Sequence, residues 1–110
     1  MPAETAHGDI WWADLDKRRP VVIASRDDIR GMRHRTTVAT ITSTIRRIPS
    51  EVELDERDGL KGLSALNCDE IVTIDKSRLV RRIGRLSKQR LGEFHHALAF
   101  ALALPVEDRP

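Results

Sequence analysis

Residues 20–24, Pro-Val-Val-Ile-Ala, are the stretch of this 110-residue chain that says most about its fold. An unbroken apolar run of this length, opened by a turn-forming residue, predicts a short strand that is buried on both faces. A proline at the first position of a strand costs no ladder hydrogen bond. We therefore expect β-structure here with side chains packed above and below it.

Other segments of similar length carry strand patterns on both sides of this run. The expected strands cover residues 10–15, 37–42, 50–54, 66–74 and 81–86. In residues 37–42, an alternation of period two places Val38, Thr40 and Thr42 on one face of the strand and Ala39 and Ile41 on the other. The connections between strands are polar, and residues 26–35 are charged and contain a glycine, which predicts a loop.

The C-terminal third contains the only strong helical pattern. Ser87 is a good N-cap residue, and residues 75–78 favour one earlier helical turn. Apolar residues then follow the helical spacing at Leu91, Phe94, Leu98, Ala101 and Leu102. This stripe is expected to pack on the open side of the sheet. The fold class is thus mostly β with a C-terminal helix (α+β), built on a curled, partly closed sheet.

Length and composition favour one domain that spans residues 1–110. The chain is 40% hydrophobic and 33% charged, which is typical of a soluble globular protein. Residues 1–7 are expected to form a flexible tail and residues 107–110 a frayed end. The N-terminus lacks the pattern of a signal peptide, and the longest apolar stretch, residues 97–106, is too short to span a membrane. The single cysteine, Cys68, excludes an intrachain disulfide, so we expect a cytoplasmic protein.

Charge is nearly balanced overall but is unevenly distributed. There are 19 Lys and Arg residues against 17 Asp and Glu, which gives a net charge of +2. Acidic residues cluster between 51 and 58, whereas basic residues gather at 18–19, 30–35, 46–47 and 78–90. Such segregation is compatible with one positive face for a polyanion such as RNA. The alternative is a set of solvated surface strips with no partner.

Two short polar motifs are candidates for chemistry at strand ends. Arg18-Arg19-Pro20 could hold a guanidinium that clamps a phosphate in a bidentate manner, or it could be a pair of solvated loop arginines. Thr42-Ser43-Thr44 offers hydroxyls that could orient a ribose 2′-OH, or that could make local turn hydrogen bonds.

Two acidic residues inside an expected strand are a third candidate. One carboxylate of Asp69-Glu70 could accept a proton from an attacking 2′-OH, or both could lie on an exposed face paired with arginine. The four histidines and the cysteine have no spacing typical of a metal site, so no metal or other cofactor is expected. Trp11 and Trp12 should lie on opposite faces of their strand, with at least one in the core.

Several of these segments together resemble the MazF/PemK toxins of bacterial type II toxin–antitoxin systems. The matching stretches are Gly8-Asp9-Ile10-Trp11 with Asp14-Leu15-Asp16, Arg19-Pro20-Val21-Val22-Ile23 with Ser25, Val38-Ala39-Thr40-Ile41-Thr42-Ser43, Ile48-Pro49-Ser50-Glu51-Val52-Glu53-Leu54, and Thr73-Ile74-Asp75-Lys76-Ser77-Arg78-Leu79 followed by Ile83-Gly84-Arg85-Leu86. Their order and spacing cover the chain from about residue 8 to residue 104.

The resemblance implies an SH3-like, partly open β-barrel of the CcdB/PemK/MazF toxin type. It also implies a homodimer, a cognate antitoxin with an acidic C-terminal segment, and a metal-independent endoribonuclease that cleaves single-stranded RNA at short sequences. The arginine that precedes the proline in the family falls on Arg19, and its strand-end threonine falls on Thr42. With Asp69, these are the expected catalytic residues, while Arg18, Ser43 and Glu70 are expected to contact RNA.

The chain departs from the family pattern at two places. Some members use an Arg-x-Asp sequence, but this chain has Asn67-Cys68-Asp69, so the aspartate is kept without the arginine. Better-known members carry a long loop between the first two strands, whereas here residues 16–18 alone separate Leu15 from Arg19.

The expected reaction is attack of a 2′-OH on the adjacent phosphodiester, which leaves a 2′,3′-cyclic phosphate and a 5′-OH. The alternatives are a DNA gyrase poison of the same fold, a non-catalytic RNA-binding module and a protein-interaction barrel.

Overall fold

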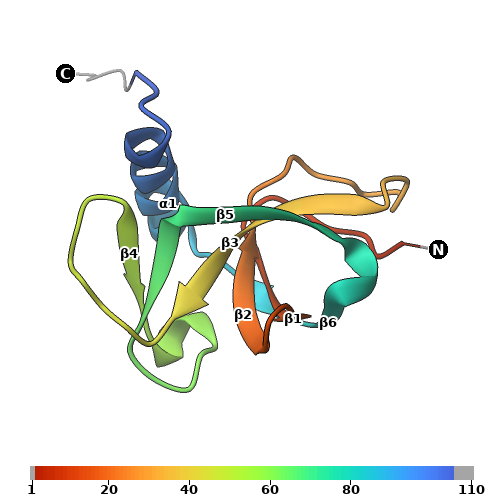
Figure 1. The fold of residues 1–110 in the computed structure, drawn as a ribbon, viewed down its shortest axis with the longest axis horizontal. Helices are drawn as coiled ribbons and strands as arrows, with labels where there is room; N and C mark the ends of the chain where they lie inside the picture. Colours follow the sequence, from red (N-terminus) through yellow and green to blue (C-terminus); the bar gives the residue numbers. More distant parts are fainter. Residues whose placement is uncertain (1, 106–110) are drawn as a thin grey trace.

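The computed structural model describes residues 2–105, which form one six-stranded antiparallel sheet and one long helix (Figure 1). The strands are β1 (Asp9–Asp14), β2 (Arg18–Ile23), β3 (Arg35–Thr42), β4 (Glu51–Leu54), β5 (Ser64–Asp75) and β6 (Leu79–Arg85), and the helix is α1 (Lys88–Ala101). Their order in the sheet is β4-β5-β3-β2-β1-β6. The sheet curls, and α1 packs against β4 and β5 at one side of it. The expected mostly β chain with a C-terminal helix is confirmed.

Strand β2 lies inside the sheet and is covered on both faces, as its apolar run predicts. Val21, Val22 and Ile23 are fully buried. Val22 belongs to the core cluster that includes Phe94 of α1, whereas Val21 and Ile23 belong to a second cluster on the other face. Because both faces of β2 are packed, the strand is a rigid support for the residues at its ends.

Strand β3 alternates as the sequence indicates. Ala39 and Ile41 join the core cluster under α1, and Val38 joins the second cluster. The strand begins at Arg35, earlier than expected, and ends at Thr42. Thr42 is therefore the last residue of an interior strand and lies where the chain leaves the sheet and turns.

A loop of three residues, 15–17, joins β1 to β2. The last pair of the ladder is Asp14 opposite Arg18, and the Leu15 N–H donates to the Lys17 carbonyl at 3.1 Å. This hairpin confirms that the connection before Arg19 is short. Because the pairing continues to the loop, the backbone of Arg19 is held by β1, with Ala13 as its direct partner.

Strand β5 is longer than expected and contains an irregularity that the sequence does not predict. In its ladder with β3, Ile71 lies opposite Ala39, but the next pair is Asn67 opposite Thr40. Residues 68–70 therefore have no partner in β3 and bulge out of the register. This bulge carries both acidic candidates, Asp69 and Glu70.

Helix α1 begins after Ser87, whose side-chain oxygen accepts a hydrogen bond from the Arg90 N–H at 3.1 Å. The apolar stripe packs on the sheet, with Phe94 fully buried at its centre. The assignment of Leu102 to this stripe is wrong, because the helix ends at Ala101 and the Leu102 side chain is 53% exposed. No helix within residues 2–105 is long and apolar enough to cross a bilayer.

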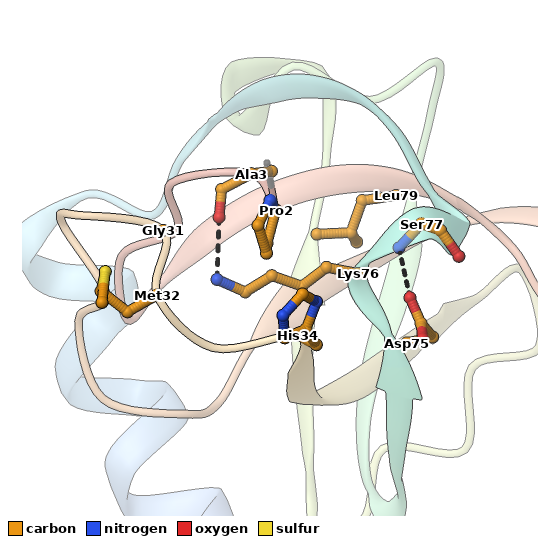
Figure 2. Close-up of a pocket in the computed structure, with 9 residues that line it drawn as sticks. All are labelled: Pro2, Ala3, Gly31, Met32, His34, Asp75, Lys76, Ser77 and Leu79. Carbon is orange, nitrogen blue, oxygen red and sulfur yellow. Dashed lines mark hydrogen bonds between the residues drawn. The ribbon is translucent and has the colours of Figure 1, made fainter.

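The expected flexible tail at residues 1–7 is wrong for the part that the structure describes. Thr5 is buried and forms an antiparallel bridge with Asp28. The ammonium group of Lys76 donates to the Ala3 carbonyl at 2.8 Å (Figure 2). It also forms an ion pair with Asp28. The N-terminal segment is held by a tertiary contact that its own sequence does not show, because Lys76, the residue directly after β5, reaches it. Residue 1 and the expected frayed end at 107–110 lie outside the described residues.

Candidate functional site

Two of the expected catalytic residues face each other at the end of the β2–β3 ladder. The ladder pairs Val22 with Ala39 and Val21 with Thr40. Continuing this register by two residues places Arg19 opposite Thr42. Directly opposed residues of antiparallel strands share one face of the sheet. The hairpin fixes the backbone of Arg19 opposite Ala13 of β1, and the register of β2 with β3 then brings it beside the last residue of β3.

Arg19 and Thr42 both line a cavity of about 470 Å³, here called the strand-end cavity. Its described lining residues are Trp12, Lys17, Arg18, Arg19, Pro20, Ile41, Thr42, Ser43, Thr44, Leu60, Lys61, Gly62, Leu63 and Ser64. Four of these residues are cationic, four carry hydroxyl groups, and none of these lining residues is a carboxylate. Such a lining suits a phosphodiester, which needs positive charge and hydrogen-bond donors.

The two arginines of this cavity differ in exposure. Arg18 is open to solvent, and a hydrogen bond from its Nε to Asp14 at 2.8 Å raises the pKa of its guanidinium further. The Arg19 side chain is only 18% exposed, and its one ion pair, with the exposed Asp16, is long at 3.4 Å. The Arg19 Nε is buried and has no hydrogen-bond partner among the described residues. Arg19 therefore holds unused donors in a partly desolvated place, where an anion gains most from them.

Thr42 uses part of its hydroxyl group locally. Its Oγ1 accepts a hydrogen bond from the Thr44 N–H at 3.1 Å, which is the turn contact that the sequence left open as an alternative. Because the Thr42 oxygen only accepts in this contact, the proton of its hydroxyl group can still be donated to another partner. The turn therefore fixes the Thr42 oxygen in place, and it does not prevent a further hydrogen bond to a ligand.

A second cavity, of about 710 Å³, opens on the other side of Arg19 and is here called the sheet cavity. Arg19, Arg35, Thr40, Glu70 and Arg78 are among its lining residues. The Thr40 hydroxyl donates to Glu70 Oε2 at 3.0 Å. Arg19 is thus the residue at which the strand-end cavity and the sheet cavity meet, and Glu70 lies on the sheet-cavity side.

Asp69 is not brought to Arg19. Its carboxylate accepts a short hydrogen bond from the Ser50 hydroxyl at 2.5 Å, and Asp69 does not line either cavity. The bulge at residues 68–70 separates the two acidic side chains, one toward Ser50 and the other toward Thr40. Of the six expected site residues, Arg18, Arg19, Thr42 and Ser43 gather at the strand-end cavity, Glu70 lies next to it, and Asp69 lies apart.

Two cationic residues of the cavity, Lys17 and Lys61, were not expected from the sequence. Lys17 belongs to the hairpin loop and Lys61 to the turn after β4, while Trp12 of β1 also lines the cavity. The sequence shows a turn at Lys61-Gly62, but no local pattern tells which strand end that turn approaches. Trp11, in contrast, is half-buried and packs against the second core cluster without belonging to its buried residues.

Other features of the described residues do not make a competing site. His7 Nε2 lies 2.8 Å from His95 Nε2, but no group of three potential metal-ligating side chains forms within residues 2–105. Figure 2 shows a further cavity, of about 760 Å³, lined by Pro2, Met32, His34 and Leu79 among others. Its buried cation, Lys76, is already neutralised by Asp28, so it has no charge left for an anionic ligand.

Known proteins share this architecture. A family model described as PemK-like, MazF-like toxin of type II toxin–antitoxin system matches residues 6–102. A curated relative, the probable endoribonuclease MazF5 of Mycobacterium tuberculosis, is 38% identical over 105 residues, which cover 93% of this chain and 96% of that relative.

Two solved structures have closely similar folds. The Mycobacterium tuberculosis toxin MazF-mt6 superposes with a TM-score of 0.84 at 37% identity, covering 89% of this chain and 99% of the other. A mycobacterial endoribonuclease in complex with its cognate antitoxin has a TM-score of 0.81 at 28% identity, covering 94% and 99%. The expected toxin-type barrel is confirmed, and the chain belongs to the PemK-like, MazF-like toxins of type II toxin–antitoxin systems.

Proposed function

We propose that this chain is a toxin that cuts single-stranded RNA as a metal-independent endoribonuclease. The observation that carries the proposal is the strand-end cavity, with four cations, four hydroxyl-bearing residues and no carboxylate among its described lining residues. The names of similar proteins support it, since MazF5 is a probable endoribonuclease. RNA also carries its own nucleophile, the 2′-OH, so the protein has to supply alignment, proton transfer and charge stabilisation.

Arg19 and Thr42 would act on the two ends of the reacting group. The 2′ oxygen forms a bond to phosphorus, the bond from phosphorus to the 5′ oxygen breaks, and a 2′,3′-cyclic phosphate and a 5′-OH are left. Arg19 donates hydrogen bonds to the phosphate oxygens on which negative charge builds up. Thr42 hydrogen-bonds the 2′-OH and aligns it for attack. Arg18 and Ser43 hold the neighbouring parts of the strand.

The proposal includes two protein partners. One is a cognate antitoxin whose acidic C-terminal segment binds the cationic cavity and competes with RNA. The other is a second copy of this chain, in a homodimer. A similar structure contains a cognate antitoxin, which supports the first partner.

The test uses the purified chain, mixed RNA and EDTA, followed by mapping of the new ends. We expect cleavage to persist in EDTA and to leave 2′,3′-cyclic phosphates. Loss of one preorganised donor costs about a hundred- to a thousandfold in rate, so Arg19→Ala should fall by that factor or more. Arg30→Ala is the matched control, because Arg30 is exposed and lies outside both cavities.

Two results would reject this mechanism. One is full activity of the Arg19→Ala protein, which would remove the assigned source of charge stabilisation. The other is cleavage of a substrate with a 2′-deoxy group at the scissile nucleotide, because the reaction proposed here has no nucleophile without that hydroxyl.

A further inference from the structure

We propose that Glu70, and not Asp69, accepts the proton of the attacking 2′-OH. This inference rests on the proposed ribonuclease function and assigns the proton acceptor that the strand-end cavity itself lacks. None of the described residues lining that cavity carries a carboxylate or an imidazole. The neighbouring sheet cavity shares Arg19 and has three carboxylates among its lining residues, those of Asp16, Glu70 and Asp75. Asp16 is paired with Arg19, and Asp75 accepts a hydrogen bond from the Ser77 N–H. Glu70 is therefore the acceptor of this cavity that we assign.

The hydrogen bond to Thr40 places Glu70 on the face of the sheet that carries Arg19 and Thr42. Thr40 precedes Thr42 by two residues on the same face of β3, which corresponds to about 6.5–7 Å along a strand. The Thr40 hydroxyl donates to Glu70 Oε2 at 3.0 Å and so holds the carboxylate over this face. Thr40 itself is buried, at 3% exposure, which makes it a fixed anchor.

The Glu70 carboxylate lines a cavity that reaches Arg19, whereas the Asp69 carboxylate does not. Glu70 is exposed to the sheet cavity, and no cation of residues 2–105 forms a salt bridge with it. An ionised carboxylate has about four lone-pair positions, of which Thr40 uses one. Asp69 is also exposed and also accepts one hydroxyl hydrogen bond, from Ser50, but it lies outside both cavities.

The bulge in β5 explains why two adjacent carboxylates have different positions. Strict alternation counted from Asn67, which lies opposite Thr40, would place Asp69 on the face of Thr40. Alternation counted back from Ile71, which lies opposite Ala39, places Glu70 there instead. The ladder with β3 is interrupted between Asn67 and Ile71, and the chain resumes with Glu70 bonded to Thr40. The structure thus selects Glu70 for the side of the sheet that carries Arg19 and Thr42.

The step balances as a general-base reaction. The 2′ oxygen forms its bond to phosphorus while its proton passes to a Glu70 carboxylate oxygen, and the 5′ oxygen leaves with the electron pair of the broken bond. The leaving oxygen takes a proton from solvent. Arg19 stabilises the charge on the non-bridging oxygens throughout, and Glu70 gives its proton back to solvent before the next turnover.

The experiment measures kcat and KM for cleavage of a short RNA by the full-length wild type, Glu70→Gln and Asp69→Asn. Glutamine keeps an oxygen that accepts from Thr40, so it removes the basic group with the least change of structure. General-base catalysis contributes about a hundred- to ten-thousandfold, and we expect Glu70→Gln to lower kcat by a factor in that range. KM and the affinity for a 2′-deoxy analogue should stay within about twofold of wild type, and Asp69→Asn should retain its kcat.

A second pair of variants tests the anchor. Thr40→Val keeps the buried volume and removes the donor to Glu70, so kcat should fall, by less than in Glu70→Gln, with KM unchanged. Thr37→Val is the matched control, because it removes a hydroxyl on the same strand that pairs with Thr73 at 2.7 Å instead.

The possible outcomes separate the two proposals. A wild-type protein that leaves RNA intact would overturn the ribonuclease function. A wild-type protein that cuts RNA, together with a Glu70→Gln protein that cuts equally fast or an Asp69→Asn protein that is the inactive one, would overturn the assignment of Glu70 and leave the ribonuclease function standing.

Discussion

The salt dependence of binding is a quantitative test of the strand-end cavity. Binding of single-stranded nucleic acid weakens with salt, with a log–log slope of about −0.7 for each phosphate that the protein neutralises. Four cationic side chains line the cavity, namely Lys17, Arg18, Arg19 and Lys61. If each neutralises one phosphate, the slope is about −2.8, and affinity falls about fiftyfold between about 50 and 200 mM salt.

The carboxylate partners of the two arginines determine the shallowest salt dependence that the cavity can show. Arg18 pairs with Asp14 and Arg19 with Asp16, and both carboxylates are more than half exposed. Exposed ion pairs contribute only about 0–1 kcal/mol, so a phosphate should replace them. If the arginines kept these partners, the two lysines alone would give a slope of about −1.4.

The assay is fluorescence anisotropy with an all-2′-deoxy oligonucleotide, which binds without being cut, titrated across a range of KCl concentrations. Lys61→Gln should reduce the slope to about −2.1, whereas Lys88→Gln, exposed on α1 and outside the cavity, should leave it unchanged. A wild-type slope shallower than about −1.4, or identical slopes for wild type and Lys61→Gln, would refute the phosphate path through this cavity.

Three further predictions concern the framework that holds the site. Phe94→Ala should lower the free energy of unfolding by about 3–5 kcal/mol in urea titrations, whereas Phe100→Ala, at a side chain that is 60% exposed, should change it by less than about 0.5 kcal/mol. The Lys76 ammonium lowers the pKa of Asp28 to about 2, below its ordinary value of 3.8, so the contribution of this pair is complete above pH 4 and is lost as the pH falls toward 2. Urea titrations across this range should show that loss in the wild type and a weaker pH dependence in Lys76→Met. Burial raises the pKa of the Cys68 thiol to about 12, so iodoacetamide at pH 8 should label it in the unfolded chain only, and rapid labelling of the native protein would contradict its burial.

Much of the fold follows from local pattern, because the core depends on it. The run at 20–24 predicts β2, the alternation in 37–42 predicts both faces of β3, and the stripe that includes Phe94 predicts α1. In each case, one segment carries enough apolar residues to determine its own burial. The exception at Leu102 arises because a helical spacing does not by itself show where the helix ends.

The site is only partly predictable from the sequence. Arg19 and Thr42 stand out by their positions at strand ends and by family resemblance, and the register of β2 with β3, continued by two residues, then places them opposite each other. The positions of Asp69 and Glu70 depend on a bulge that becomes visible only when β5 is paired with β3. Lys61 reaches the cavity from a turn whose direction is set by packing, not by its own sequence.

The N-terminal segment illustrates the same limit. Its residues are polar and small, which is typical of a loose end, yet a buried ammonium from the end of β5 holds the Ala3 carbonyl. A contact between positions 73 residues apart cannot be recognised from either stretch alone.

The three-residue hairpin between β1 and β2 has a consequence for the kinetics of the protein. Arg19 is held in a ladder and does not sit on a mobile loop, so its position is set before any ligand arrives. No segment between these two strands is long enough to close over a bound strand. We therefore expect substrate to enter and product to leave without a gating motion of this hairpin, with the rate of encounter set by charge and diffusion.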